Sequence, residues 1–314
     1  MRPVECVLAL DVGGTTIKAA IADRDGSLLH SVRRDTGRTA GADVVVQTIL
    51  AVAQDLATEA DSSSYQVVAA GVVVPGVVDE QRGVAVESSN IGWRNVPLKD
   101  LVHDRLGLPV HVGHDVRAGA LAESRRGAAI DRSSFLFVPI GTGIGGALVI
   151  DGRPYAGASY AAAEVGHIVV RPDGEPCVCG RVGCLETVAS ASAIARRYSD
   201  AAGRWVQGAV DVAIRARGGD ATAIRIWAEA IDAMADALVI VTTLLDPELV
   251  VLGGGLAQSG SQLLDPLRQT LSERIILGQP PQLTCALLGD EAGCVGAALL
   301  ALDLVNGFIT PLGG

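Results

Sequence analysis

Four residues in the middle of the chain carry the donor atoms of a metal site. His167, Cys177, Cys179 and Cys184 supply one imidazole and three thiols within a short segment. A closed tetrahedral zinc site takes four nitrogen and sulfur donors at about 2.0 to 2.3 Å. Because four donors leave no open position for a catalytic water, we predict that Zn²⁺ at this site is structural and folds the segment around itself.

Two glutamates flank this cluster, Glu164 on one side and Glu186 on the other. Neither is needed to complete a four-donor zinc site. Carboxylates accept hydrogen bonds from hydroxyl groups, so they are natural partners for a polyol. The alternative is that the cluster is purely structural and has no bearing on chemistry. We expect instead that the metal also aims Glu164 and Glu186 at a sugar.

A glycine-rich turn near the start of the chain has the composition of a phosphate site. It joins two expected strands, whereas Walker A and Rossmann loops lead into a helix. Glycines let backbone N–H groups close around an anion, threonines add hydroxyl donors, a lysine adds charge, and an aspartate can hold Mg²⁺ through water. A plain hairpin turn, the alternative, does not require so many polar groups. The residues concerned are Asp11, Gly13, Gly14, Thr15, Thr16 and Lys18.

Two further glycine clusters follow strands later in the chain. We expect the first, which again interrupts two strands, to be a second phosphate loop. The second is either a simple turn from strand to helix or a cradle for a nucleoside, and the residues themselves leave both open. The first cluster contains Gly141, Thr142, Gly143, Gly145 and Gly146, and the second is Gly253, Gly254 and Gly255.

Asp115 follows a short expected strand, with His114 before it and Arg117 after it. Taken alone, an aspartate in this position is more often the N-cap of the helix that follows. Phosphoryl transfer, however, needs little from a protein beyond positioning, charge neutralisation and a base near the nucleophile. With two phosphate loops in the same chain, we therefore favour Asp115 as the base that takes a proton from an attacking hydroxyl.

The elements that must hold these residues form a repeated pattern. A strand, a glycine-rich turn, a strand and an Asp-Gly turn occur at residues 7–26 and again at 135–152. This repetition predicts a duplicated domain, with ligands bound between the copies at the carboxyl ends of strands. Several segments of the chain have apolar residues at helical spacing. We expect helices at residues 41–59, 116–126, 189–199, 208–217, 221–244 and 293–304.

Composition agrees with an α/β protein of two domains. The chain has 314 residues, of which 49% are hydrophobic and 19% charged, and single cores stop growing at roughly 250 to 300 residues. A net charge of −10 argues against nucleic acid as a partner. No apolar run reaches the length of about 18 residues that a membrane span needs, and the first residues resemble no signal peptide. The cysteines cluster only at the expected metal site. This argues against a disulfide framework and fits a reducing, cytoplasmic location.

Together these motifs identify a resemblance to the ROK group (repressors, open reading frames and kinases) of the actin and hexokinase superfamily. The resemblance covers nearly the whole chain and is most specific in the cysteine segment. It implies a two-lobed α/β fold, actin-like and hexokinase-like, built from duplicated ribonuclease H-like domains with a small zinc-binding insertion. The motifs are Asp11–Lys18, Pro75–Asp79, Asn90–Trp93, Gly141–Gly146, Glu164–His167 and Cys177–Glu186.

The resemblance also implies roles. The N-terminal lobe would span residues 1–116, joined by a helix near 295–314, and the C-terminal lobe 117–294. Asp115 would activate the 6-hydroxyl of a hexose, and ATP with Mg²⁺ would occupy the two phosphate loops and Gly254–Gly255. His167 would bind both sugar and zinc, and Ala292–Ala298 would form a connection between the lobes. The expected sugar contacts are Gly76, Asn90, His114, Asp115, Glu164, His167 and Glu186.

One residue departs from the resemblance. Sugar kinases of this group usually have asparagine before the catalytic aspartate, and this chain has His114. A neutral imidazole also offers one donor and one acceptor, but in a wider and flatter frame. Despite this departure, the resemblance implies a hexose kinase with glucose as first substrate and N-acetylglucosamine, N-acetylmannosamine or another hexose next. It leaves polyphosphate as an alternative donor and implies a homodimer or homotetramer.

The alternatives to a kinase are a sensor and a repressor. A sugar-binding protein of the same group that senses or regulates without catalysis remains open because of His114. A repressor is disfavoured, because a winged helix-turn-helix needs some tens of residues and only ten precede Asp11.

Overall fold

The computed structural model describes residues 4–308. The chain divides into two compact units: unit 1 holds the residues up to Ala122, the segment Ala156–Ala161 and the residues from Asp290 onward, and unit 2 holds Glu123–Tyr155 and Ala162–Gly289. The expected lobe boundary at residues 116/117 differs from this division, which assigns 117–122, 156–161 and 290–294 to unit 1. Of the expected terminal helix, residues 309–314 lie outside the described residues.

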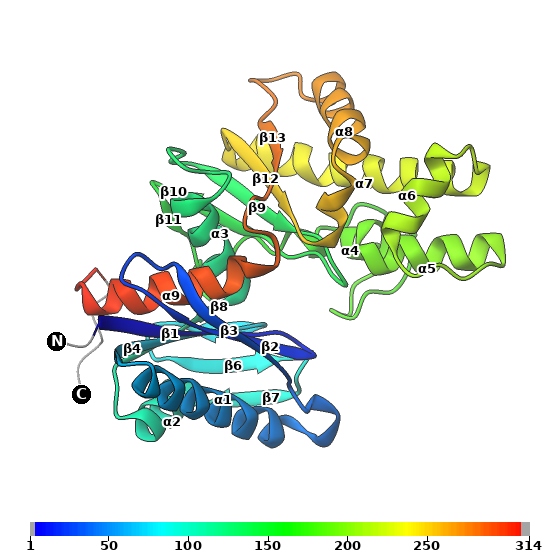
Figure 1. Ribbon diagram of the computed structural model, residues 1–314. Coiled ribbons are helices and arrows are strands. Elements are labelled where there is room, and N and C mark those ends of the chain that lie inside the picture. Colours follow the sequence, from blue (N-terminus) through cyan, green and yellow to red (C-terminus); the bar gives the residue numbers. More distant parts are fainter. Residues whose placement is uncertain (1–3, 309–314) are drawn as a thin grey trace. The chain divides into compact units, whose positions relative to one another are not determined.

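Unit 1 is built on a five-stranded sheet with the order β3-β2-β1-β4-β8 (Figure 1). β1 pairs antiparallel with β2 and parallel with β4, which in turn runs parallel to β8. A smaller sheet has the order β5-β6-β7. The strands are β1 (Val4–Val12), β2 (Thr16–Ala22), β3 (Leu28–Asp35), β4 (Tyr65–Val74), β5 (Val77–Asp79), β6 (Val84–Ser88), β7 (Trp93–Val96) and β8 (Val110–His114).

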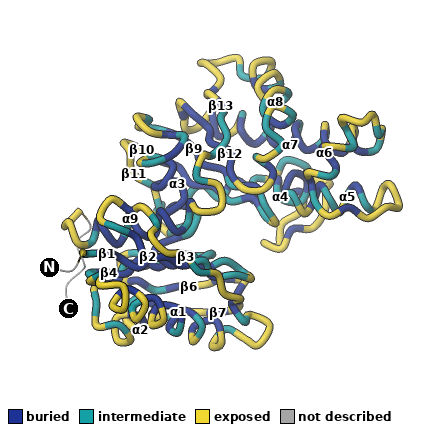
Figure 2. Tube along the Cα trace, viewed as in Figure 1, coloured by how far each residue is buried: buried dark blue, intermediate teal, exposed yellow. Residues whose placement is uncertain are grey.

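Helices cover both faces of the five-stranded sheet in unit 1. Successive side chains of a strand point to opposite faces, so a strand buried on both sides is apolar throughout. In β1, Leu8 and Leu10 pack with α1, whereas Val7 and Ala9 pack with α9. All four are buried, as the dark tube of β1 shows (Figure 2). The helices are η1 (Arg38–Ala40), α1 (Ala42–Ser62), α2 (Leu98–Leu106), α3 (Asp115–Arg126), which continues into unit 2, and α9 (Ala292–Val305).

Unit 2 repeats the same sheet order, β11-β10-β9-β12-β13. Its largest core joins one face of β9 and β12 to the helices, with α7 at the centre. The strands are β9 (Phe135–Pro139), β10 (Ala147–Ile150), β11 (Arg153–Pro154), β12 (Leu249–Gly253) and β13 (Gln282–Cys285). The helices are η2 (Val165–His167), α4 (Leu185–Ala189), α5 (Ala191–Ala202), α6 (Ala209–Arg217), α7 (Ala221–Leu245), η3 (Gly255–Ser259), α8 (Ser261–Arg274) and η4 (Gly289–Glu291), which ends in unit 1.

The repeat predicted from the glycine turns is confirmed by these two sheets. In each, the third, second, first, fourth and fifth strands in chain order lie side by side, and the first two form the hairpin that carries a glycine-rich turn. The expected helices are present within a few residues, although the helix predicted from residue 116 begins at Asp115. The short sheet β5-β6-β7 and helices α2 and α8 were not predicted.

Candidate functional site

The carboxyl ends of three parallel strands bring two aspartates to one edge of the unit 1 sheet. Asp11 pairs with Val73 across β1 and β4, and Val74 pairs with His114 across β4 and β8. Asp115 follows β8 directly as the first residue of α3. Ligands of α/β sheets bind at such strand ends. The two carboxylates therefore lie where a substrate of this sheet is expected.

The Asp115 carboxylate is held through one of its oxygens. Oδ1 accepts a hydrogen bond from the Val116 N–H at 2.7 Å and lies 3.5 Å from Nε2 of His114. An N-cap side chain normally accepts from the second or third residue after it, so this carboxylate does not act as the expected cap. Within residues 4–308, no other residue donates a hydrogen bond to Oδ2. That oxygen is the one available to a substrate proton.

The contacts of His114 define its protonation. Its Nδ1 accepts a hydrogen bond from the Arg117 N–H at 3.4 Å, so the ring proton belongs on Nε2, which faces Asp115. Burial, followed by the positive charge of Arg117, lowers the pKa of His114 to about 3. His114 is therefore neutral near pH 7, with its Nε2–H on the side of Asp115.

Asp11 and Asp115 influence each other electrostatically. Burial raises the pKa of Asp115 to about 6. Burial, and then the charge of Asp115, raises the pKa of Asp11 to about 7. Two carboxylates in a shared, poorly solvated place resist full ionisation unless a cation lies beside them. The donor set therefore fits a phosphate group that arrives with a hard divalent cation such as Mg²⁺.

The lysine of the first glycine turn is already paired. Lys18 donates to the Asp290 carboxylate at 2.5 Å and to the Asp290 carbonyl at 3.0 Å, and it lies 3.9 Å from Asp11. Asp290 also accepts from Arg33. The turn itself is closed by the Gly13 N–H, which donates to the Thr16 carbonyl at 2.9 Å. Lys18 thus connects β2 to η4, directly before α9.

The two remaining sugar candidates of unit 1 lie in the turns around the small sheet. Gly76 joins β4 to β5, and its backbone lies against Ser88 at the end of β6. Asn90 follows two residues later, and its carbonyl accepts a hydrogen bond from Arg38 at 3.3 Å. Asn90 and Arg38 also both lie beside Gly14 of the first glycine turn. The structure thus brings the first glycine turn, Asn90 and Arg38 into one region. The sequence had not indicated Arg38.

In unit 2, Glu186 is bonded to the second glycine turn. Its Oε2 accepts a hydrogen bond from the Ile144 N–H at 2.8 Å. A Cβ atom at Gly143 would lie 2.4 Å from the same oxygen, so only glycine allows the carboxylate to approach this closely. The Ala191 N–H also donates to the Gly141 carbonyl, and Ser192 donates to the carbonyl of Thr142. Glu186 and the second turn therefore form one rigid piece.

Gly254 packs against the strand that leads into the same turn. It has φ of 73°, and a Cβ atom there would lie 2.4 Å from the Ile140 carbonyl oxygen. The Leu256 N–H donates to that carbonyl at 3.1 Å. Gly255 has no atom within 4 Å of an added Cβ. The proposed nucleoside segment and phosphate turn are thus neighbours within unit 2.

His167, Cys177, Cys179 and Cys184 come together as the sequence predicted, with their ligand atoms within 4.8 Å of one another. Sγ of Cys177 lies 3.6 Å from Nδ1 of His167, and Sγ of Cys179 lies 3.6 Å from Sγ of Cys184. Bonds of about 2.0 to 2.3 Å to a tetrahedral Zn²⁺ separate neighbouring donors by roughly 3.5 to 3.8 Å. The donor set and its spacing fit zinc.

Binding of a metal to the cluster would release a proton from Cys184. Burial raises the pKa of the Cys184 thiol to about 12, so this thiol keeps its proton unless a metal displaces it. Because His167 turns Nδ1 toward Cys177, its Nε2 is the nitrogen left for another partner. Glu164 lies directly before η2, and its carbonyl accepts the His167 N–H at 3.0 Å.

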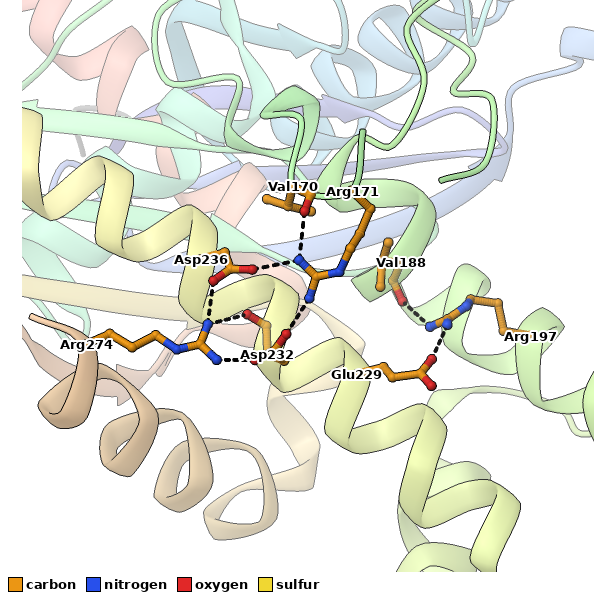
Figure 3. Close-up of polar contacts among 8 residues, drawn as sticks. All are labelled: Val170, Arg171, Val188, Arg197, Glu229, Asp232, Asp236 and Arg274. Atoms are coloured by element: carbon orange, nitrogen blue, oxygen red, sulfur yellow. Dashed lines mark hydrogen bonds and ion pairs between the residues drawn. The ribbon is translucent and has the colours of Figure 1, made fainter. Parts of the chain in front are cut away.

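Salt bridges of arginine side chains connect the metal-binding segment, residues 167–184, to α7 (Figure 3). Arg171 donates to Asp236 at 2.6 Å and also to Asp232, and Arg274 of α8 donates to the same two carboxylates. Each aspartate thus bridges two guanidinium groups. A network of this kind holds its members better than an isolated surface pair does. Arg171 lies between the histidine and the first cysteine of the cluster, so the network ties the metal segment to two helices.

A second arginine, Arg197, holds α4, the helix that bears Glu186. Arg197 of α5 donates to Glu229 of α7 and, at 3.4 Å, to the Val188 carbonyl of α4 (Figure 3). α4 is only five residues long and begins directly after Cys184. Both sides of the cysteine segment are therefore anchored to α7. Neither set of arginine contacts could be predicted, because salt bridges between distant helices leave no local pattern in a sequence.

Known proteins resemble this chain over almost its full length. The model of the ROK family matches residues 7–304. A glucokinase of Thermotoga maritima is 32% identical, covering 96% of this chain and 98% of that protein. The structure of a ROK hexokinase from Thermus thermophilus superposes with a TM-score of 0.81 at 34% identity, covering 96% of this chain and 99% of the other.

A third comparison concerns a ligand complex. A ROK family glucokinase from Streptomyces griseus, solved with glucose and AMPPNP, superposes with a TM-score of 0.78. It is 34% identical, covering 94% of this chain and 99% of the other. Among residues 4–308, no helix is both long and apolar enough to cross a membrane.

Proposed function

The chain belongs to the ROK family and has its actin-like, hexokinase-like fold of two duplicated α/β domains, and we propose that it is an ATP-dependent hexose kinase acting on the 6-hydroxyl of glucose. The observation that carries this proposal is Asp115. It lies at the carboxyl end of β8, has a raised pKa of about 6, and keeps Oδ2 free of other described donors. A base with a pKa near the working pH is efficient in proton transfer.

The reaction follows from these residues. Asp115 accepts the proton of the sugar's 6-hydroxyl, the oxygen bonds to the γ-phosphorus of ATP, and ADP leaves. Mg²⁺ bound with ATP would neutralise phosphate charge, and Asp11 would hold it through water. The glycine turns at Gly13–Thr16 and Gly141–Gly145 supply N–H groups to the phosphates, and Gly254–Gly255 contact the nucleoside.

The hexose is recognised by hydroxyl partners from several segments. Unit 1 supplies main chain at Gly76 and the side chains of Asn90 and His114. Unit 2 supplies three further hydrogen-bonding groups for the sugar hydroxyls: Glu164, Nε2 of His167 and the remaining lone pairs of Glu186. His167, Cys177, Cys179 and Cys184 would hold a structural Zn²⁺, which would fix the orientation of His167.

A substrate panel tests this function. The protein is incubated with ATP or polyphosphate and with glucose, mannose, N-acetylglucosamine or N-acetylmannosamine, and ADP or phosphorylated sugar is measured. We expect ATP and glucose to give the highest kcat/KM. The matched control, 6-deoxyglucose, lacks the accepting hydroxyl and should give no turnover.

A variant then tests the assignment of the base. Asp115→Ala should abolish phosphorylation while zinc content stays unchanged. Unaltered turnover of this variant would refute the role of Asp115. Calorimetric binding of a hexose without turnover by the wild type would instead favour a sugar sensor.

A further inference from the structure

Glu80 lies directly after β5, and no role has been assigned to it above. Its Oε1 accepts the main-chain N–H of His114 at 3.0 Å and Nε of Arg117 at 3.0 Å. Nη2 of Arg117 lies 3.0 Å from the same oxygen. One carboxylate oxygen thus contacts the residue before Asp115 and the residue two positions after it.

Arg117 is a buried charge that depends on this partner. Its side chain is 4% exposed, whereas that of Glu80 is 26% exposed. Within the described chain, Glu80 is the carboxylate at ion-pair distance from it. A buried guanidinium that loses its counter-ion is strongly destabilising, whereas a charge-assisted pair has a defined geometry. The pair therefore fixes where the first turn of α3 lies.

Tyr160 extends the pair into a closed ring. Nη1 of Arg117 donates to the Tyr160 carbonyl at 3.1 Å, and the Tyr160 hydroxyl donates to Asp79 at 2.9 Å, next to Glu80 in the chain. Tyr160 has φ of 60°, a conformation that a bulky side chain adopts only where its surroundings enforce it. Three distant segments, 79–80, 114–117 and 160, thus hold one another in unit 1.

We propose that Glu80 is a positioning residue for Asp115: with Arg117 and Tyr160 it forms a ring that fixes the corner between β8 and α3 from which the catalytic carboxylate projects. This inference rests on the proposed function. The Asp115 carboxylate accepts the N–H of its own neighbour Val116 and lies 3.5 Å from the His114 ring, so it moves with this corner. A displacement of about 1 Å can lower a rate about 100-fold.

The ring also balances charge next to the base. Arg117 lowers the pKa of Asp115, opposing the effect of burial. Asp11 of β1 is the carboxylate that faces Asp115, and Lys18 and Asp290 are the charges that face Asp11 in turn. His114 is neutral. Loss of the Glu80 charge leaves Arg117 uncompensated and should lower the pKa of Asp115, whereas loss of Arg117 should raise it.

The experiment compares Glu80→Gln and Arg117→Met with the wild type in steady-state kinetics across pH 5 to 9. Glu80→Gln keeps an oxygen acceptor but loses the charge. We expect kcat to fall about 10- to 100-fold while KM for glucose and ATP changes less than threefold. The acid limb of kcat/KM should move to lower pH in Glu80→Gln and to higher pH in Arg117→Met.

The matched control is Glu87→Gln. Glu87 on β6 pairs with Arg94 at 2.9 Å, but both side chains are exposed and neither contacts the corner. Its kcat and pH profile should stay within twofold of wild type. If Glu80→Gln does not fold, Glu80→Asp, which retains the charge on a shorter stem, should fold and show the same loss of kcat without the shift of the acid limb.

Two results separate this inference from the proposed function. If the wild type phosphorylates no hexose, the proposed function fails. If the wild type is active and Asp115→Asn is not, but folded Glu80→Gln or Glu80→Asp retains kcat within twofold and an unchanged pH profile, the positioning role is overturned while the kinase remains.

Discussion

Replacing Asp115 by asparagine should make the protein more stable and inactive. The carboxylate is poorly solvated, and burial raises its pKa from 3.8 to about 6. The charged form therefore destabilises the folded state near neutral pH. Asparagine keeps an oxygen acceptor for the Val116 N–H without the charge. Activity should fall by a factor of about 10² to 10⁴, the usual contribution of a general base.

The size of the stability gain follows from the pKa. A shift of about 2 units, at 1.36 kcal/mol per unit, corresponds to about 3 kcal/mol. Because 27% of the side chain is exposed, water screens part of this effect, and we expect about 2 kcal/mol. For a protein of this length, that raises Tm by about 3 to 6 °C at pH 7.5.

The gain should depend on pH in a defined direction. The folded-state pKa is raised, so the penalty of the charged carboxylate is absent below the unfolded value of 3.8 and complete above about 6. Thermal unfolding of both proteins at pH 7.5 and pH 4.5 measures it, and the difference in Tm should shrink by more than half at pH 4.5. Asp104→Asn, an exposed change on α2, serves as the control with no difference at either pH. A variant no more stable than the wild type at pH 7.5 would refute the electrostatic reasoning.

Three further changes test unit 2. Gly254→Ala places a Cβ 2.4 Å from a carbonyl oxygen and should raise KM for ATP at least tenfold with little effect on KM for glucose. The control is Gly208→Ala, which lies outside the proposed ATP contacts and has nothing within 4 Å of an added Cβ, so it should leave the same kinetics unchanged. Arg171→Ala removes the salt bridges that hold the metal-binding segment to α7 and should speed zinc loss to a chelator about tenfold. A chromophoric indicator measures the rate, and an unchanged rate would contradict the role of these salt bridges. Chelation of the wild type should lower Tm and raise KM for glucose, and a sugar affinity indifferent to metal removal counts against the coupling.

The sequence predicted the elements that local patterns define. Two glycine turns after aliphatic strands were enough to predict a duplicated α/β fold, because strand alternation and turn chemistry are short-range. The four metal ligands were predictable for the same reason, since their spacing lies within one segment. The position of Asp115 was predictable because it directly follows a recognisable strand, β8.

Long-range pairing explains what the sequence did not predict. The phosphate role of Lys18 stays a prediction, whereas its ion pair with Asp290 was not predicted, because Asp290 is far away in the chain and no local pattern connects the two residues. Glu186 was predicted to hold a sugar, and its second contact was not predicted: one of its oxygens accepts the Ile144 N–H, because α4 packs on the second glycine turn. Glu80 gave no signal at all, because its role depends on two segments brought beside it by the fold.

The most direct test of the central claim is the identity of the product. Phosphorus NMR of wild-type protein with glucose and ATP should show a sugar phosphate whose phosphorus couples to the protons on carbon 6, formed in equal amount with ADP, and Asp115→Asn should form it at least about 100-fold more slowly. A phosphate on any other oxygen, ADP without sugar phosphate, or equal product from Asp115→Asn would contradict the account.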